Sequence, residues 1–223
     1  MEKPKTVKEC KKDIEFLMKY AVPKKQMETA KALLEKYEAD IIALNLLHNF
    51  YVNLPEGEDD SVNGIRLLTS RQGVFLLCVF TGNGMNYLYI VNRVAAYILG
   101  TLAEGIIDRE LLDFFGYADN SSVLSLTNKP EDLQVYEPYS ADSKLCPSCH
   151  VSEGEFHTLG CPVEICPWCK GQLTYCNCRF NKLNTDTLDK VAQVEELMEL
   201  LEEEGRISFK KEHSPGYPTM DDE

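Results

Sequence analysis

Seven of the nine cysteines in this 223-residue chain lie between Cys146 and Cys178. They include two Cys-x-x-Cys pairs, and a pair of this kind places two thiolates at the separation that two corners of a metal tetrahedron require. Each pair needs two further ligands to close its site. Because the metal affinity of so short a segment is also its folding free energy, this cluster constrains the fold more than any other feature.

The stretch offers nine candidate ligands, its seven cysteines with His150 and His157, one more than two closed sites need. His150 directly follows Cys149, and adjacent residues rarely both reach one tetrahedral centre, so His157 is the better ligand. An interleaved assignment, in which ligand pairs alternate between the metals, uses the same residues and stays open. The sequential assignment gives one site of Cys146, Cys149, His157 and Cys161 and a second of Cys166, Cys169, Cys176 and Cys178.

We expect two structural zinc ions. A reduced cytoplasmic chain favours metal binding over disulfides, and a Cys₃His site favours zinc over iron. Closed four-ligand sites leave no position for water or substrate, which argues against metal catalysis. A zinc deaminase would carry Glu two residues after the ligating His, where this chain has Leu159. The CPWC sequence at 166–169 is typical of dithiol redox sites as well, but its cysteine-rich setting favours a metal knuckle.

The motifs of this stretch are CPxC, EGEFH at 153–157, LGC at 159–161, Glu164, and CPWCKGQL followed by CNC. Together they resemble a Cys/His-rich double zinc module of uncharacterised bacterial proteins, over residues 146–180 only. The resemblance implies a metal-binding module and a bacterial or phage origin, with no assigned reaction. Proteins of that kind carry Gly after the first CPxC, which supports leaving His150 outside the ligand set.

The fold class that we expect is α+β, with a mainly helical N-terminal domain over residues 1–143 that includes a small strand element. Apolar spacing predicts four helices. They cover residues 6–21, Met27 to Tyr51 as one long helix, residues 85–105, and Asp108 to Gly116. An acidic loop at 55–64 precedes a β-like patch at 65–80, and 117–143 is expected to be a linker.

The remaining domains are a two-zinc ribbon or knuckle module at 144–182, an acidic helix with a short strand at 183–209, and a flexible acidic tail at 210–223. Asp186 is the expected cap of this helix and Gly205 its stop. The net charge of −13 is concentrated here, since residues 183–223 hold twelve acidic and four basic side chains. No secretory signal is visible, and the longest apolar run, Val74 to Phe80, is too short to span a bilayer. We therefore expect a cytoplasmic protein.

Outside the cysteine-rich stretch the sequence shows no catalytic constellation. Cys10 and Cys78 lie in apolar patterns and are expected to be buried thiols, and His48 a core or boundary histidine. We expect a non-enzymatic, zinc-stabilised interaction or regulatory protein, for example an immunity or inhibitor factor of bacterial or phage conflict systems. Its partner would be a protein, and the acidic surface favours a basic one. A nucleic-acid-binding zinc protein is the alternative, based on Lys144, Lys170, Arg179 and Lys182, and an enzyme with its site in 60–145 comes third.

Overall fold

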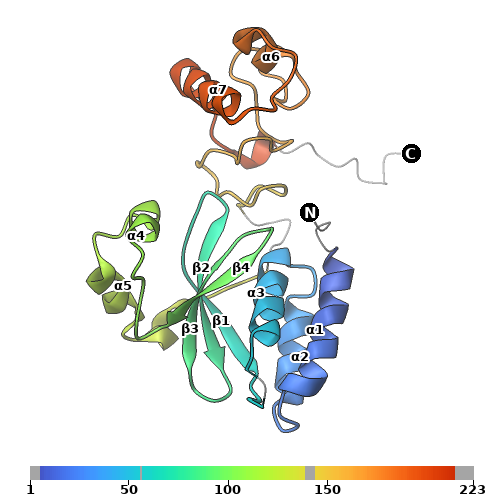
Figure 1. Ribbon diagram of the computed structural model, residues 1–223, viewed down its shortest axis with the longest axis vertical. Coiled ribbons are helices and arrows are strands. Elements are labelled where there is room, and N and C mark those ends of the chain that lie inside the picture. The colour runs from blue at the N-terminus through green and yellow to red at the C-terminus, as the bar shows by residue number, and fades with distance from the viewer. Residues whose placement is uncertain (1–5, 56, 139–143, 214–223) are drawn as a thin grey trace. The chain divides into compact units, whose positions relative to one another are not determined.

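The computed structural model describes residues 6–55, 57–138 and 144–213 (Figure 1). The chain divides into two compact units, residues 1–140 and 141–223, and each is described by itself. The first unit begins with three helices, α1 (Val7–Ala21), α2 (Met27–Lys36) and α3 (Ile41–Val52). Four strands follow, β1 (Val62–Arg71), β2 (Val74–Thr81), β3 (Asn86–Val91) and β4 (Ala96–Thr101). The unit ends with α4 (Arg109–Phe115), α5 (Asn120–Thr127), a 3₁₀ turn (Pro130–Asp132) and β5 (Gln134–Val135).

The strands form one antiparallel sheet in the order β4-β3-β2-β1-β5, so the expected α+β class is confirmed, with a sheet larger than the sequence suggested. Helices α1–α3 cover one face and α4 and α5 the other (Figure 1). Leu76, Cys78 and Leu88 of the sheet pack with Leu112 and Val123 from the second helical layer. Since both faces are covered, β2 is apolar along nearly its whole length.

The long helix predicted from Met27 to Tyr51 is wrong, because the chain leaves the helix after Lys36 and begins another at Ile41. Asp40 is the reason for the break. Its backbone is extended (ψ 104°), and its carboxylate accepts the N–H of Ala43 at 3.0 Å as the N-cap of α3. The apolar rhythm continues across the break because both helices turn apolar faces to the core.

The helix predicted over 85–105 is also wrong, since β3 and β4 occupy this segment. The two strands are joined by a turn in which Asn92 N–H donates to the carbonyl of Ala95 at 3.0 Å. Apolar residues recur here every three or four positions, which is typical of a helix. In a sheet covered on both faces, however, apolar residues need not alternate with polar ones. The spacing therefore does not distinguish a strand from a helix here.

The expected linker over 117–143 contains α5, the 3₁₀ turn and β5, which adds to the sheet beside β1. Tyr136 just after it is 5% exposed, so this segment belongs to the core of the first unit. Residues 139–143 lie outside the described part. By contrast, the helix predicted from Asp108 to Gly116 is confirmed: Asp108 caps α4, and Gly116 ends it with a left-handed backbone (φ +78°).

The second unit holds α6 (Cys178–Leu183), α7 (Val191–Glu204) and a 3₁₀ turn (Lys211–His213). The predicted acidic helix is α7, but it begins at Val191, so Asp186 is not its cap. Gly205 ends it, as expected, at φ +92°. The strand expected over 206–209 is wrong, since this segment forms no strand and makes only one pair of backbone hydrogen bonds with other described residues, between Phe209 and residues 154–155.

Of the tail predicted over 210–223, residues 214–223 lie outside the described part. Among the helices that the structure describes, none has the length and apolar content needed to cross a bilayer.

Candidate metal centres

The ligand atoms of the first predicted site lie together. Those of Cys146, Cys149, His157 and Cys161 are all within 4.8 Å of one another, and we call this group the first cluster. The Sγ atoms of Cys146 and Cys161 are 3.8 Å apart, and the Sγ of Cys149 lies 3.3 Å from Nδ1 of His157. The imidazole therefore faces the cluster through Nδ1. Cys146, His157 and Cys161 are buried, so the first cluster is largely closed to solvent.

The second predicted site also assembles. Cys166, Cys169, Cys176 and Cys178 bring their Sγ atoms within 4.8 Å of one another, and we call this group the second cluster. Cys166 is buried, Cys176 and Cys178 are half-buried, and Cys169 is exposed. The clusters thus follow the sequential assignment, and the interleaved one does not match this geometry. The two differ in solvent access and in donor set, three sulfurs and a nitrogen against four sulfurs.

The two Cys-x-x-Cys turns are the same structure displaced by twenty residues. Cys146 N–H donates to the carbonyl of Val151 at 2.8 Å, and Cys166 N–H donates to that of Gly171 at 2.7 Å. The hairpin continues with Glu153 N–H to Lys144 O at 2.9 Å and its counterpart, Leu173 N–H to Glu164 O at 2.8 Å. The sequence interpretation missed this repeat, although the motifs CPSC and CPWC, which begin twenty residues apart, were a visible sign of it.

The surplus histidine has a backbone role. His150 lies outside both clusters, with φ +59°, and Lys170 holds the equivalent place in the second turn with φ +62°. Each closes its turn by donating its N–H to the first cysteine's carbonyl, at 2.9 Å in both cases. This left-handed conformation is one that glycine adopts without strain. The requirement at position 150 is therefore conformational, which agrees with its exclusion from the ligands.

The crowded thiols of each cluster shift each other's proton affinity. Hydrogen bonds with the side chains of Cys146 and Cys149 lower the pKa of Cys161, and hydrogen bonds with the side chains of Cys149 and then Cys161 raise the pKa of Cys146. In the second cluster, the backbone N–H of Gly171 and then the side chain of Cys166 lower the pKa of Cys169 to about 7. Because metals bind thiolates, the lowered pKa favours the ligating form of Cys161 and of Cys169, whereas the raised pKa of Cys146 favours its thiol.

An ion pair is buried in the second unit. Nη2 of Arg206 lies 2.6 Å from Oε1 of Glu164, and the two side chains are 7% and 1% exposed. The same Nη2 donates to the backbone carbonyl of His157 at 2.5 Å, and Nε of Arg206 donates to Glu164 at 2.7 Å. Burial raises the pKa of Glu164, and the positive charge of Arg206 opposes that rise. Sequence reasoning singled out Glu164 as part of the motif but gave no sign of its partner.

The apolar core of the second unit is built around the cysteines. Phe209 is fully buried and packs with Cys146, Val151 and Val163 at the first cluster. Its ring meets that of His157 edge to face, with centroids 5.2 Å apart. At the second cluster, Leu197 and Leu201 of α7 pack on Cys166 and Leu173. The segment from 191 to 209 therefore packs on both Cys-x-x-Cys turns.

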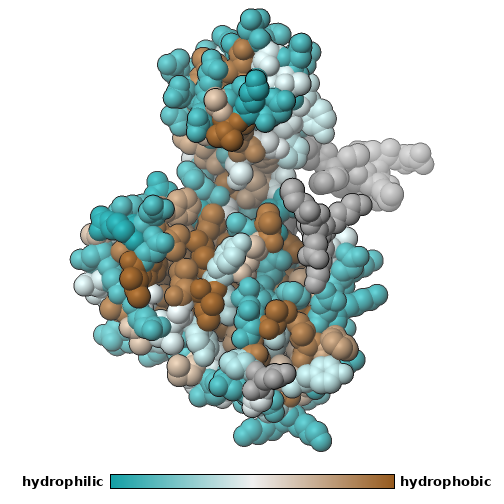
Figure 2. All heavy atoms as spheres, viewed as in Figure 1, coloured by the Kyte–Doolittle hydropathy of each residue, from teal (hydrophilic) through white to brown (hydrophobic). Residues whose placement is uncertain are grey.

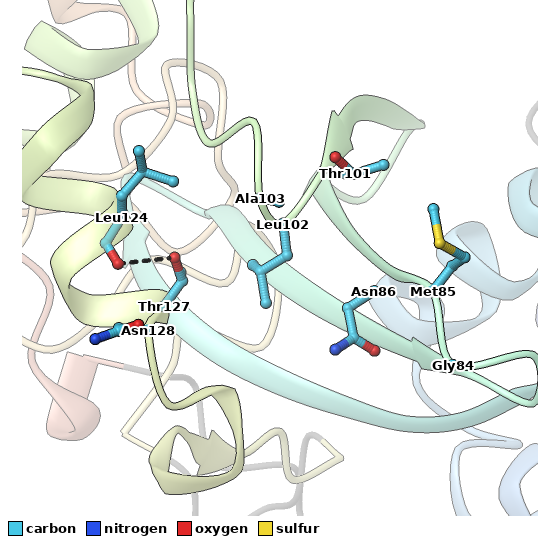
Figure 3. Close-up of a pocket in the computed structure, with 9 residues that line it drawn as sticks. All are labelled: Gly84, Met85, Asn86, Thr101, Leu102, Ala103, Leu124, Thr127 and Asn128. Carbon is cyan, nitrogen blue, oxygen red and sulfur yellow. Dashed lines mark hydrogen bonds between the residues drawn. The ribbon is translucent and has the colours of Figure 1, made fainter.

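The first unit carries a pocket of about 520 Å³ between α5 and the ends of β3 and β4 (Figure 3). Its polar groups are amides and hydroxyls, and the Oγ1 of Thr127 donates to the carbonyl of Leu124 at 3.4 Å. None of its nine lining residues has a side chain that titrates near neutral pH, so the pocket gives no support to an enzyme site in 60–145. The lining residues are Gly84, Met85, Asn86, Thr101, Leu102, Ala103, Leu124, Thr127 and Asn128.

The other residues with reactive side chains are placed largely as expected. Cys10 and Cys78 are buried, Cys10 with its Sγ 3.7 Å from the carbonyl of Leu44. Burial raises the pKa of Cys78 to about 12, which leaves it an inert thiol at neutral pH. His48 is half-buried on α3.

Apolar side chains also reach the surface. Figure 2 shows brown apolar atoms on the visible faces of both units. In the first unit Val94, in the turn before the edge strand β4, and Tyr97 and Ile98, in β4, are 83%, 63% and 47% exposed.

Comparisons with models of protein families, with curated proteins and with solved structures find no match for this chain.

Proposed function

We propose that this chain is a non-enzymatic interaction or regulatory protein whose C-terminal unit is built on two structural zinc ions. One observation carries the proposal: each cluster offers four protein ligand atoms within 4.8 Å. Four protein ligands complete a tetrahedral zinc site and leave no position for water or substrate. The metals would then hold the shape of a binding surface and take no part in a reaction.

Zinc fits the distances of the first cluster. With Zn–S bonds of about 2.3 Å, the sulfurs at two corners of a tetrahedron are about 3.8 Å apart. The Sγ atoms of Cys146 and Cys161 are 3.8 Å apart. A nitrogen donor among three sulfurs favours zinc over a single iron ion. The second cluster, with four sulfurs, suits either metal on its donors alone.

The metal part of the proposal is tested by elemental analysis of protein purified without added metal, which should give two zinc ions per chain. Chelation should then abolish amide-exchange protection over 144–209 and leave the sheet of the first unit protected, because metal affinity is folding free energy for the small unit. Fewer than one metal ion per chain, or disulfides that account for the cysteines, would refute it.

The partner that we propose is a protein with a basic surface. Helix α7 exposes six glutamates, which we call the glutamate face, and none of them forms an ion pair with another described residue. Such a surface attracts a cationic partner and repels nucleic acid. A basic toxin or nuclease inhibited by this chain is one form of the interaction. The glutamate face consists of Glu195, Glu196, Glu199, Glu202, Glu203 and Glu204.

Site-directed photo-crosslinking in the native host tests the partner. A photoreactive residue at Glu199 should capture a basic protein, whereas one at exposed Lys31 on α2 should not. Changing Glu196, Glu199 and Glu203 to Lys should abolish capture, and changing them to Gln should weaken it. If position 199 captures no protein and purified chain turns over a substrate, the proposal is wrong.

Nucleic-acid binding is the second candidate, and a local surface favours it. No acidic side chain occurs between Glu164 and Asp186. Near the second cluster Tyr175 is 78% exposed, and Nζ of Lys182 lies 5.5 Å from the ring centre of Trp168. An exposed tyrosine, and a partly buried tryptophan beside a lysine, suit stacked, single-stranded bases. Retention of single-stranded DNA or RNA at low salt, lost in Tyr175→Ala, would support this candidate, and no retention at low salt would exclude it.

A further inference from the structure

The orientation of His157 leaves one ring nitrogen unexplained. Nδ1 faces the first cluster, 3.3 Å from Sγ of Cys149. Nε2 is buried and has no hydrogen-bond partner among the described residues. A histidine that binds a metal through one nitrogen carries a proton on the other, and that N–H usually donates to a carboxylate, a carbonyl or a water. An acceptor for Nε2–H is therefore required.

Glu164, in turn, lacks a hydrogen-bond donor for one of its carboxylate oxygens within the described part of the chain. Its Oε1 is occupied by Arg206, but its Oε2 is buried and accepts no hydrogen bond from any described residue. The residue as a whole is 0% exposed. A buried carboxylate oxygen without a donor costs free energy that a native structure normally avoids. Glu164 therefore requires a donor for Oε2.

Arg206 brings these two residues together. A single nitrogen of its guanidinium, Nη2, bonds to both the Oε1 of Glu164 and the backbone carbonyl of His157. Those two oxygens consequently lie no further apart than the two bond lengths combined. The unpaired donor and the unpaired acceptor thus belong to residues that share one guanidinium, inside the same buried region.

We infer that Glu164 is the outer carboxylate of the first metal centre and accepts the Nε2–H of His157 through one buried water. Glu164 is then a positioning residue: it keeps the proton on Nε2, so Nδ1 presents its lone pair to the metal. Arg206 holds the carboxylate in place and neutralises its charge. The second cluster, which has no histidine, needs no such partner. This inference rests on the proposed metal binding of the first cluster.

The unmodified protein gives the first test, once elemental analysis has confirmed two metal ions per chain. Long-range proton–nitrogen NMR should show His157 with Nδ1 ligated and Nε2 protonated, with slow exchange of that proton against water. Ligation through Nε2, or a proton on Nδ1, would overturn the inference.

The second test measures metal affinity by competition with a chromophoric chelator. Since removing an outer-shell partner typically costs 10–100-fold in affinity, Glu164→Gln should weaken one metal by that factor and leave the other unchanged. Cadmium NMR distinguishes the Cys₃His site from the Cys₄ site and should assign the loss to the first cluster. The matched control is Glu153→Gln, at an exposed glutamate on the hairpin of the first cluster, which should bind both metals as the parent does.

Glu164→Gln leaves the charge of Arg206 buried without its partner, so the variant can fail for that reason alone. The double variant Glu164→Gln, Arg206→Met removes both charges, a replacement that buried ion pairs often tolerate. It should fold around two metals, bind the first 10–100-fold more weakly and exchange the Nε2 proton faster. First-site affinity equal to that of the parent would refute the role of Glu164. Fewer than one metal ion per parent chain would instead refute the proposed function.

Discussion

The hydroxyl of Tyr136 donates a 3.0 Å hydrogen bond to Oδ2 of Asp40, a residue ninety-six positions earlier in the chain. Both residues are buried, at 5% and 2% exposed, and the other oxygen of Asp40 caps α3. The hydroxyl of Tyr37 in turn donates to the backbone carbonyl of Tyr136 at 2.6 Å. The hydrogen bond between Tyr136 and Asp40 joins the start of α3 to the segment after β5, and so holds the end of the first unit's chain to its N-terminal helices.

Tyr136→Phe should therefore destabilise the first unit by about 1–3 kcal/mol, because it removes a donor from a buried carboxylate and leaves the ring in place. Denaturant unfolding followed by a signal from the first unit measures this difference. Tyr20→Phe, at a 73% exposed tyrosine on α1, is the control and should change the free energy of unfolding by less than about 0.5 kcal/mol. Equal stability of the two variants would contradict the role of this contact.

Cys161→Ser should remove one metal ion per chain and leave the other, because the first cluster loses one of its four ligands. Amide exchange should accelerate over 144–163 and near Phe209, while the hairpin of the second cluster stays protected. Elemental analysis with hydrogen exchange measures both effects. Cys10→Ser, at a buried thiol outside the clusters, should keep two metal ions; loss of both metals in Cys161→Ser would show that the sites fill only together.

Phe209→Ala should cost the second unit about 3–5 kcal/mol, the usual range for a fully buried aromatic ring. The ring packs with Cys146 and Val151 and against the imidazole of His157, so the first metal should also dissociate faster. Unfolding of the metal-loaded protein and the rate of metal transfer to a chelator test this. Tyr175→Ala, at a 78% exposed ring, should leave both unchanged.

The first unit should lose stability in alkali, and Cys78 should account for part of the loss. Burial raises its pKa from 9.0 to about 12 in the folded state. Below pH 9 the thiol is protonated in both states and has no effect. Between pH 9 and 12 only the unfolded chain releases the proton, which costs the folded state about 1.4 kcal/mol per pH unit.

Cys78→Ala tests this, since the variant should be less stable at pH 8 because of its cavity but should lose less stability from pH 8 to pH 10.5 than the parent. Denaturant unfolding at both pH values gives the two slopes. Identical slopes would show that Cys78 does not titrate as its burial requires.

The features that sequence reasoning placed correctly depend on local chemistry. Asp108 and Gly116 bound α4 because capping and left-handed termination are decided by single residues. The gathering of the cysteines and His157 into two clusters follows from spacing for the same reason, since a Cys-x-x-Cys turn is a local structure. Choosing the sequential pairing needed the fold.

The errors share a physical cause: apolar spacing indicates which residues are buried, but it does not distinguish a helix from a strand. The segment 85–105 is apolar on a helical rhythm, yet Leu88 and Tyr89 face opposite sides of a sheet and both are buried. The short strand β5 was invisible because two residues carry no periodicity. The Glu164–Arg206 pair was likewise beyond reach, because forty-two residues separate its members and only the folded unit brings them together.

The ribosome makes Arg206 and Phe209 after all the ligands of the first cluster. Every ligand of the first cluster has been translated once Cys161 is made, but Arg206 lies forty-nine residues beyond His157. A ribosome still making the last helix therefore carries a chain that has all its thiolates and neither the guanidinium nor the aromatic ring that closes over them. A metal bound there as proposed would still exchange with the cell's pool at that stage, and it would be trapped only once residues 206–209 have been made and packed.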